Sequence, residues 1–240
     1  MSAPVIRRSP VHSATVVAGT TLTPRMRRVT LRCPALAGAE VRPAQDVELL
    51  LREPSGRRVK RRYTISRFRA DRGELDLDVV LHGDGPGARW GATAQPGDPV
   101  EFQGPRGKLE LRPAPWHLLV GDESALPAIA AIAEALSAAD EPALAVVEVH
   151  DPDEQQPIAA ADVRWVHRAG AAPGGAELLG AALAGLQPPA GARAYLLGES
   201  RAMIALRPLV EAAGIAHENV FVKGYWNVGR PDRLAGRAPG

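Results

Sequence analysis

Cysteine, aromatic residues and long apolar runs are all scarce in this chain of 240 residues. Cys33 is the only cysteine, which excludes an internal disulfide and an all-cysteine metal cluster. A single free cysteine is usually a small buried hydrophobe, and we expect that role for Cys33 rather than a catalytic one. His12, His117, His150 and His217 do not fall at metal-ligand spacings, so we expect no protein metal site.

The sequence also lacks long hydrophobic segments. Residues 1–17, MSAPVIRRSPVHSATVV, contain no apolar run of signal-peptide length. Asp122 and Glu123 interrupt the best candidate for a membrane span. These features predict a cytoplasmic protein without a membrane span.

Charge of one sign is not in large excess, because the formal net charge is only +2 with a pI near 9.0. This balance does not indicate a nucleic-acid-binding protein. The basic residues are nevertheless clustered in residues 57–72, RRVKRRYTISRFRADR, where Asp71 is the one acid. Two interpretations stay open: a solvated strand face that discourages edge pairing, or a pocket for an anionic ligand.

Residues 12–113 have the pattern of short strands separated by turns. In ELDLDVVLH (74–82), apolar side chains alternate with Asp76 and Asp78, which is the period of a half-buried strand. The last predicted strand is GKLELRP, residues 107–113. A short segment after HGDGPG is the single helical candidate in this half. The pattern favours an antiparallel β-barrel or sandwich.

The pattern changes near residue 114. WHLLVG (116–121) is a continuous apolar strand, and ALPAIAAIAEALSAA (125–139) has helical spacing. Strands and helices then alternate as far as KGYW (223–226), which predicts a parallel sheet covered by helices. We therefore expect two domains, 1–113 and 114–240, the second ending in a loose tail.

Each half contains a candidate phosphate site. VGDESALPAI (120–129) joins a strand to a helix, where backbone N–H groups and the helix dipole favour an anion. The alternative is a capped helix start, with Asp122 or Ser124 as the cap. LLGES (196–200) repeats the strand–Gly–Glu–helix arrangement, and both turns lie where open α/β sheets bind ligands.

In the first half, the candidates are RRYTIS (61–66) and HGDGPGARW (82–90). Arg61 and Tyr63 share a strand face, which suits a ligand with a pyrophosphate and a planar ring, while Thr64 points away unless the strand bends. The glycine-rich loop would add N–H donors and a helix start. An ordinary strand with an Arg and a Tyr is the alternative.

Taken together, these motifs resemble a known family. RRYT, DVVLHGDGPGARW, PGDPVEFQGPRG, GDESALPAI, LLGES and KGYWNVG occur in the order and spacing of the siderophore-interacting proteins. These are FAD-dependent ferric-siderophore reductases of the ferredoxin-reductase-like superfamily. The resemblance covers nearly the whole chain. It implies an N-terminal antiparallel FAD-binding β-barrel, followed by a C-terminal Rossmann-like parallel α/β domain that accepts NAD(P)H.

The resemblance also implies roles for individual residues. For FAD, it implies Arg61 on the pyrophosphate, Tyr63 against the ring and Thr64 near the reactive nitrogen. Further FAD contacts are implied at the backbone of Val80, Leu81 and His82, at Gly87, Ala88 and Arg89 on the pyrophosphate, at Trp90, and at the closing aromatics Tyr225 and Trp226. For the nicotinamide dinucleotide it implies Gly121, Asp122, Glu123, Ser124, Ala125, Leu126, Gly198 and Glu199.

Related reductases carry an arginine near position 168 that meets the 2′-phosphate of NADP, so Arg168 is the candidate here, with His167 beside it. The alternative for Arg168 is an exposed loop residue. The sequence departs from the family at Ser66 and Asn227, where basic residues are common. We hypothesise that Lys60, Arg62, Lys223 and Arg230 compensate by binding the anionic siderophore.

The sequence thus predicts an NAD(P)H-dependent ferric-siderophore reductase that uses FAD and needs no catalytic acid or base residue. The siderophore itself and the choice between NADPH and NADH are left open. Two alternatives remain: a flavin reductase whose acceptor is a protein such as ferredoxin or flavodoxin, and a non-catalytic module that binds a siderophore or flavin.

Overall fold

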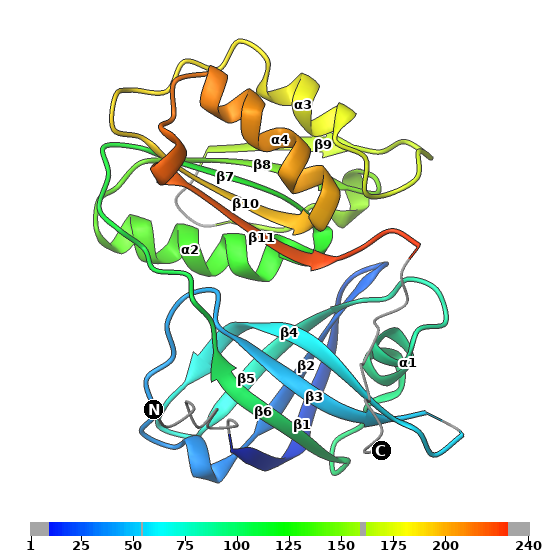
Figure 1. Ribbon diagram of the computed structural model, residues 1–240. Helices are drawn as coiled ribbons and strands as arrows, with labels where there is room; N and C mark the ends of the chain where they lie inside the picture. Colours follow the sequence, from blue (N-terminus) through cyan, green and yellow to red (C-terminus); the bar gives the residue numbers. More distant parts are fainter. Residues whose placement is uncertain (1–9, 54, 159–161, 230–240) are drawn as a thin grey trace, which may run out of the picture.

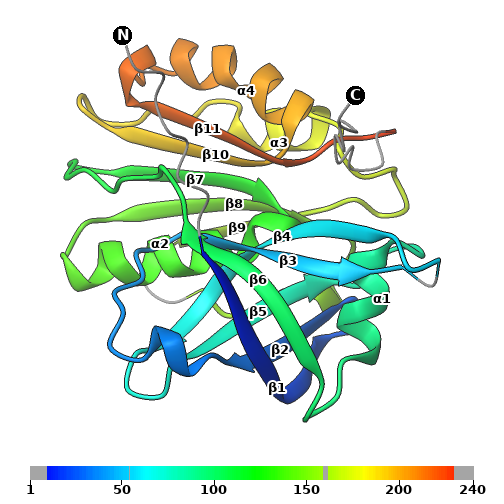
Figure 2. The ribbon, with the colours of Figure 1, turned by 60° about the horizontal axis from the view of Figure 1, so that its bottom comes forward.

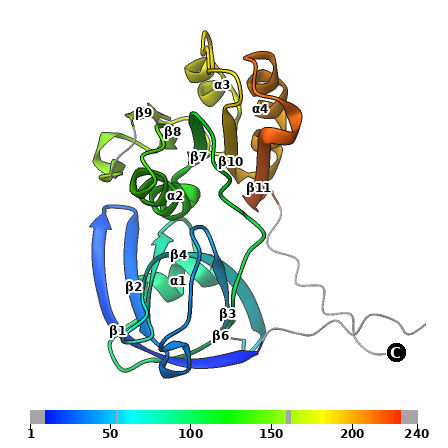
Figure 3. The same ribbon diagram turned by 90° about the vertical axis from the view of Figure 1, so that its left-hand side faces the viewer.

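The chain folds into a closed antiparallel barrel and a parallel five-stranded sheet, which confirms the predicted fold class (Figure 1). The computed structural model describes residues 10–53, 55–158 and 162–229. The barrel and the sheet lie one above the other, and one helix of the sheet faces the barrel (Figures 1 and 3).

The barrel contains six strands in the order β1-β2-β5-β4-β3-β6. The strands are β1 (Val11–Thr23), β2 (Met26–Arg32), β3 (Asp46–Arg52), β4 (Arg58–Arg69), β5 (Glu74–Val80) and β6 (Pro99–Arg106). A 3-10 turn, η1 (Pro34–Leu36), follows β2, and the helix α1 (Pro86–Thr93) lies at the side of the barrel (Figure 2).

The sheet has the strand order β11-β10-β7-β8-β9, and every neighbouring pair is parallel. Its strands are β7 (His117–Asp122), β8 (Ala143–Val149), β9 (Asp162–His167), β10 (Arg193–Glu199) and β11 (Val220–Trp226). Helices α3 (Glu177–Leu183) and α4 (Ser200–Ala212) cover one face, and α2 (Leu126–Ala138) covers the other (Figure 1). Three 3-10 turns complete this half: η2 (Glu123–Ala125), η3 (Pro152–Glu154) and η4 (His217–Asn219).

Helix α2 packs between the sheet and the barrel (Figure 3). Its Ile129 and Ile132 are fully buried, and they share one apolar cluster with Met26 of the barrel and Leu109 of the connecting segment. Burial of this much apolar surface fixes the two halves against each other. Polar bonds add to it, because Lys223 Nζ lies 2.9 Å from Asp46 and Thr23 donates to Glu154 at 2.5 Å.

The predicted strand at 107–113 is wrong. These residues form the connection from barrel to sheet, and none of the described strands pairs with them. Strand β6 already pairs with β1 on one side and β3 on the other, so the closed barrel offers no free edge. The alternating leucines have another use, since Leu109 is buried in the cluster under α2. Cys33 is fully buried, as predicted.

The outer face of β5 is covered by paired charges. Leu75, Leu77 and Val79 point into the barrel and are fully buried. On the other face, Asp76 accepts two bonds from Arg69, at 2.7 and 2.9 Å, and one from Thr30. Burial alone would raise the pKa of Asp76, but the bonds from Arg69 and Thr30 outweigh it and hold that pKa below its ordinary value.

The same face pairs Asp78 with Arg28 and Glu74 with Arg32 and Arg69. Part of the basic run at 57–72 therefore covers the barrel wall, because its Arg69 belongs to this ladder of ion pairs. Arg69 therefore fits neither interpretation of the basic run, because it is bound in ion pairs on the barrel wall and does not line a ligand pocket.

We expect Asp76→Asn to lower the free energy of unfolding by about 1–3 kcal/mol at pH 7, because a buried charge-assisted network loses its anion. An Asp with a depressed folded pKa stabilises the fold above its unfolded pKa of about 3.9, and that stabilisation is lost as the pH falls through the folded pKa. The stability difference between parent and variant should therefore shrink below pH 4. Thermal unfolding at pH 7 and pH 3 measures it.

The matched control is Asp71→Asn, which changes a carboxylate that is largely exposed. It should leave the unfolding temperature nearly unchanged at both pH values. An Asp76→Asn difference of the same size at pH 7 and pH 3 would contradict the role given to the ionised carboxylate.

Candidate functional site

The residues predicted to hold FAD come together on one side of the barrel. Gly87, in the first turn of α1, lies so close to β4 that a Cβ atom there would collide with the Tyr63 hydroxyl and lie 3.4 Å from Arg61 Cγ. The Trp90 ring is tilted against the Tyr63 ring, with their centroids 6.1 Å apart. The close approach favours glycine at position 87, because a larger residue would displace either α1 or the Tyr63 ring.

The amino end of α1 is open, and its carboxyl end is held in place. The N-cap residue of α1 is Gly85, which has no side chain to bond to the first N–H groups of the helix, and a Cβ added there would point into open space. At the other end, Arg27 donates to the carbonyls of Gly91, Ala92 and Ala94. The free N–H groups at the start of a helix are a place where an anion binds. Sequence reasoning missed Arg27, because nothing in MRRVTL marks one arginine as a helix anchor.

Further predicted contacts follow β5. Val80 ends the strand opposite Met26, and the N–H of Leu81 donates to the carbonyl of Arg25 at 2.7 Å. His82 is exposed at the start of the loop that leads into α1. Ala88 and Arg89 lie in the first turns of α1. The structure therefore brings this segment and Tyr63 to the same side of the barrel.

Thr64 and Tyr225 meet where the barrel and the sheet approach each other. Thr64 is buried on β4 beside Asp46 of β3, and Tyr225 comes from the end of β11. Burial raises the pKa of the Tyr225 phenol, an effect that the neighbouring Thr64 side chain opposes. The Tyr225 hydroxyl is buried and has no hydrogen-bond partner of normal geometry among the described residues. An orphaned hydroxyl at this place fits a site completed by a polar ligand.

The predicted nicotinamide turn is built around Asp122. This residue caps the 3-10 turn η2 by accepting from the N–H of Ser124, whereas α2 itself follows Ala125 and has no side-chain cap. The next residues, Ala125 and Leu126, are buried in the cluster under α2, so their side chains serve packing. Gly121 lies tight against the Leu197 carbonyl, where a Cβ could not be accommodated.

Glu199, at the end of β10, also acts as a capping carboxylate. It caps α4 by accepting from the N–H groups of Arg201 and Ala202, and its other oxygen accepts from Val228 at 3.1 Å. The two predicted strand–Gly–acid–helix turns thus lie side by side on β7 and β10, with both carboxylates turned inward.

Arg168 is 5% exposed, so the alternative of an exposed loop arginine is wrong. Its Nη2 lies 2.8 and 3.0 Å from the two oxygens of Glu123, and its Nη1 lies 3.3 Å from Glu148. Burial raises the pKa of Glu148, and the charge of Arg168 opposes the rise. The role on the 2′-phosphate stays a prediction, and it would require Arg168 to exchange a carboxylate partner for the phosphate.

The predicted substrate-binding cations are paired with carboxylates. Glu48 bonds to Lys60 at 2.7 Å and to Arg62 at 3.4 Å, and Asp46 bonds to Lys223 at 2.9 Å. Arg106, which sequence reasoning missed, contacts both carboxylates. These four basic residues share two carboxylates, so the group keeps a positive excess at the junction of barrel and sheet. Arg230 lies outside the described residues.

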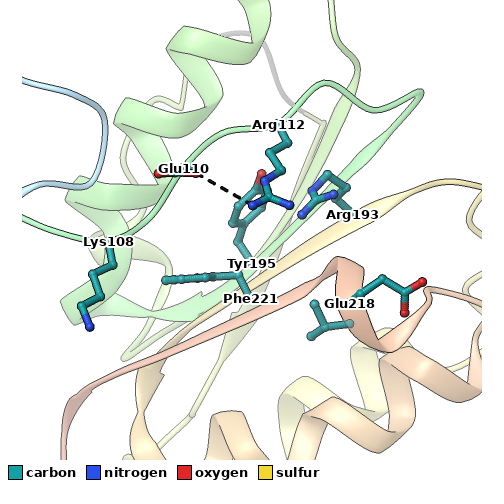
Figure 4. A pocket seen from close by; sticks show the side chains of 8 residues that line it. Lys108, Glu110, Arg112, Arg193, Tyr195, Glu218 and Phe221 are labelled. Carbon is teal, nitrogen blue, oxygen red and sulfur yellow. Dashed lines mark ion pairs between the residues drawn. The ribbon is translucent and has the colours of Figure 1, made fainter.

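A separate cavity of about 180 Å³ lies toward the amino ends of β10 and β11. Figure 4 shows Lys108, Arg112 and Arg193 around it, together with the aromatic side chains Tyr195 and Phe221. None of its lining residues is a predicted site residue. The candidate site is therefore the junction at the carboxyl ends of the strands, and not this cavity.

The described residues also limit what else the site could be. No cluster of three or more His, Cys, Asp or Glu side chains there is placed to hold a metal ion. Nor does any helix in that part of the chain combine the length and the apolar character needed to cross a membrane.

Comparisons with known proteins cover both halves. Residues 52–109 match the model of the siderophore-interacting FAD-binding domain, and residues 114–229 match that of the siderophore-interacting protein. The chain is 34% identical over 187 residues to ferric vibriobactin reductase ViuB of Vibrio cholerae, an alignment that covers 74% of this chain and 68% of the relative. It is 31% identical over 163 residues to the NADPH-dependent ferric-chelate reductase of Escherichia coli, covering 65% of this chain and 62% of that one.

A solved structure agrees with these matches. The siderophore utilization protein from T. fusca superposes with a TM-score of 0.83 at 35% identity, over 95% of this chain and 97% of that one. The two matched models begin at residue 52 and so leave β1, β2 and most of β3 uncovered, but the structural similarity extends over these strands as well, and both comparisons point to the same group of proteins. The chain belongs to the siderophore-interacting protein family.

Proposed function

We propose that this protein is an FAD-dependent oxidoreductase that passes electrons from NADPH or NADH to ferric iron held by a siderophore, and so releases ferrous iron. We call the space between the start of α1 and the Tyr63 ring the α1 cradle. The observation that carries the proposal is that this cradle lies beside the place where Tyr225, at the end of β11, meets Thr64 of the barrel. The names of the Vibrio cholerae and Escherichia coli relatives support the same reaction.

The described residues fit FAD. The start of α1 offers backbone donors to a pyrophosphate, with Arg61 beside it and Tyr63 and Trp90 forming an aromatic wall. The orphaned Tyr225 hydroxyl lies next to Thr64, where a ring with polar atoms could satisfy it. When bound, FAD supplies the redox chemistry, taking a hydride from a nicotinamide and passing electrons on singly.

The chain itself supplies placement and electrostatics. One NAD(P)H gives two electrons, so two ferric ions are reduced for each nicotinamide oxidised. The turn after β7 and the turn after β10 would place the dinucleotide at the carboxyl ends of the strands, as in other open α/β sheets. Helix α2 packs on the barrel through an apolar cluster, which would exclude water from that side of the site.

The positive excess around Lys60, Arg62, Arg106 and Lys223 would attract an anionic ferric siderophore. Because these cations are already paired with Glu48 and Asp46, we expect the attraction to be modest and to weaken as salt rises. A cytoplasmic location and a domain boundary after residue 113 stay predictions.

The purified protein should be yellow or become so with FAD, and anaerobic NADPH or NADH should bleach its flavin bands. A ferric siderophore should then restore the bands while a ferrous-specific dye develops colour. A protein that stays colourless with FAD would contradict the proposal. Bands that recover with ferredoxin or flavodoxin but not with a ferric siderophore would favour the protein-acceptor alternative.

Gly87→Ala should weaken FAD binding by about tenfold or more, because the new methyl group must displace α1 or the Tyr63 ring from the cradle. The Kd for FAD, titrated into apoprotein by flavin fluorescence quenching, measures it. Gly180→Ala, in helix α3 of the sheet, is the control, since a Cβ there meets only the ends of leucine side chains away from the barrel. Equal Kd values for both variants would show that the close contact at Gly87 is unimportant for FAD.

Arg168→Ala tests the predicted 2′-phosphate contact. If Arg168 exchanges Glu123 for the phosphate, KM for NADPH should rise by about tenfold with little change for NADH, because the lost interaction is a charge-assisted one. Steady-state kinetics with both cofactors decide it. Glu123→Gln should act in the opposite direction by releasing the arginine. An unchanged preference in Arg168→Ala means that this residue only holds Glu123 and Glu148.

A further inference from the structure

Asp122 lies where the strands of the sheet end, and both of its carboxylate oxygens are fully used. Oδ1 accepts from the backbone N–H of Ser124 at 2.9 Å and from its hydroxyl at 2.5 Å. Oδ2 accepts from the backbone N–H of Glu199 at 2.8 Å and from Nε1–H of Trp226 at 2.8 Å. A carboxylate has about four acceptor positions, so a ligand would have to displace one of these bonds.

The backbone closes tightly around this carboxylate. Gly198 has a φ of +153°, and a Cβ there would lie 2.7 Å from Asp122 Oδ2. Asp122 itself is 5% exposed. A buried carboxylate with four donors is costly to disturb, because each lost partner leaves a group unpaired.

Other hydrogen bonds hold the end of β11 and the residues that follow it, 226–228. Ser200 donates to the Trp226 carbonyl at 2.9 Å, and Val228 N–H donates to Glu199 at 3.1 Å. A Cβ at Gly174 would lie 3.0 Å from the Trp226 ring, so the ring is also enclosed from that side. The end of β11 is thus fastened to β7 and β10 through buried carboxylates rather than through strand pairing alone.

We infer that Asp122 is a positioning residue and not a nicotinamide ligand. Its carboxylate sets the rotation of the Trp226 indole and the path of the turn Glu123–Ala125 at the same time. The aromatic end of β11 and the dinucleotide turn are therefore held in one fixed relation. The inference rests on the proposed function only for its consequence, which is that this relation makes the site ready for a nicotinamide dinucleotide.

Asp122→Asn tests this role, because an amide has a single acceptor oxygen and turns its NH₂ toward donors in either orientation. We expect the Kd for NADP⁺ and for NAD⁺, measured by calorimetry on protein saturated with FAD, to rise about tenfold. Trp226→Phe removes the indole donor together with one ring of the side chain, and it should weaken binding in the same direction. In the double variant the two effects should not add, because they break the same bond.

A second reading needs no nucleotide. The difference in emission between the parent and Trp226→Phe gives the contribution of Trp226. The same difference, taken between Asp122→Asn and the double variant, should lie at longer wavelength because the indole gains contact with water. Asp76→Asn, a buried carboxylate of the barrel wall, is the matched control and should lower stability without moving either reading.

Parent-like Kd values in Asp122→Asn, or additive effects in the double variant, would overturn the positioning role, as would an unshifted emission. A parent protein that binds no dinucleotide and whose flavin is not bleached would instead contradict the proposed function. In that case the emission of Trp226 still decides whether Asp122 holds the indole.

Discussion

The packing of α2 on the barrel is the contact on which the rest of the molecule depends. Ile129 and Ile132 bury themselves against Met26 and Leu109, and this apolar cluster is continuous with the core under the sheet. Because hydrophobic packing is non-directional, hydrogen-bonded ion pairs such as Lys223 to Asp46 are needed to fix the angle between the barrel and the sheet. Only in that arrangement do the ends of β7, β10 and β11 reach the side of the barrel that carries α1.

Buried carboxylates then define the local geometry. Asp122 and Glu199 accept backbone and indole donors at the strand ends, and Asp46 and Glu48 accept basic side chains at the junction. Buried charges are stable only when they are paired or hydrogen-bonded, so each carboxylate draws its partners into one arrangement. The same requirement explains why basic residues that look free in the sequence are engaged in the structure.

The sequence predicted the barrel, the parallel sheet and most element positions, because alternation in ELDLDVV and helical spacing in ALPAIAAIAEAL are local properties. It failed at 107–113, where alternating leucines serve a connecting segment instead of a strand. It also missed Arg27 and Arg106. Their partners are 64 to 67 and 58 to 60 residues away in the chain, and local patterns carry no information on such pairs.

The sequence by itself determined which residue types lie at the strand ends, where glycine permits close approach, and which half would suit a flavin and which a nicotinamide. The tertiary structure alone decided that Arg168 is buried between Glu123 and Glu148, that Lys60 and Lys223 are paired, and that Asp122 faces Trp226. The physical reason is that electrostatic and hydrogen-bond partners are chosen by distance in space, whereas periodicity records only the secondary structure of each segment.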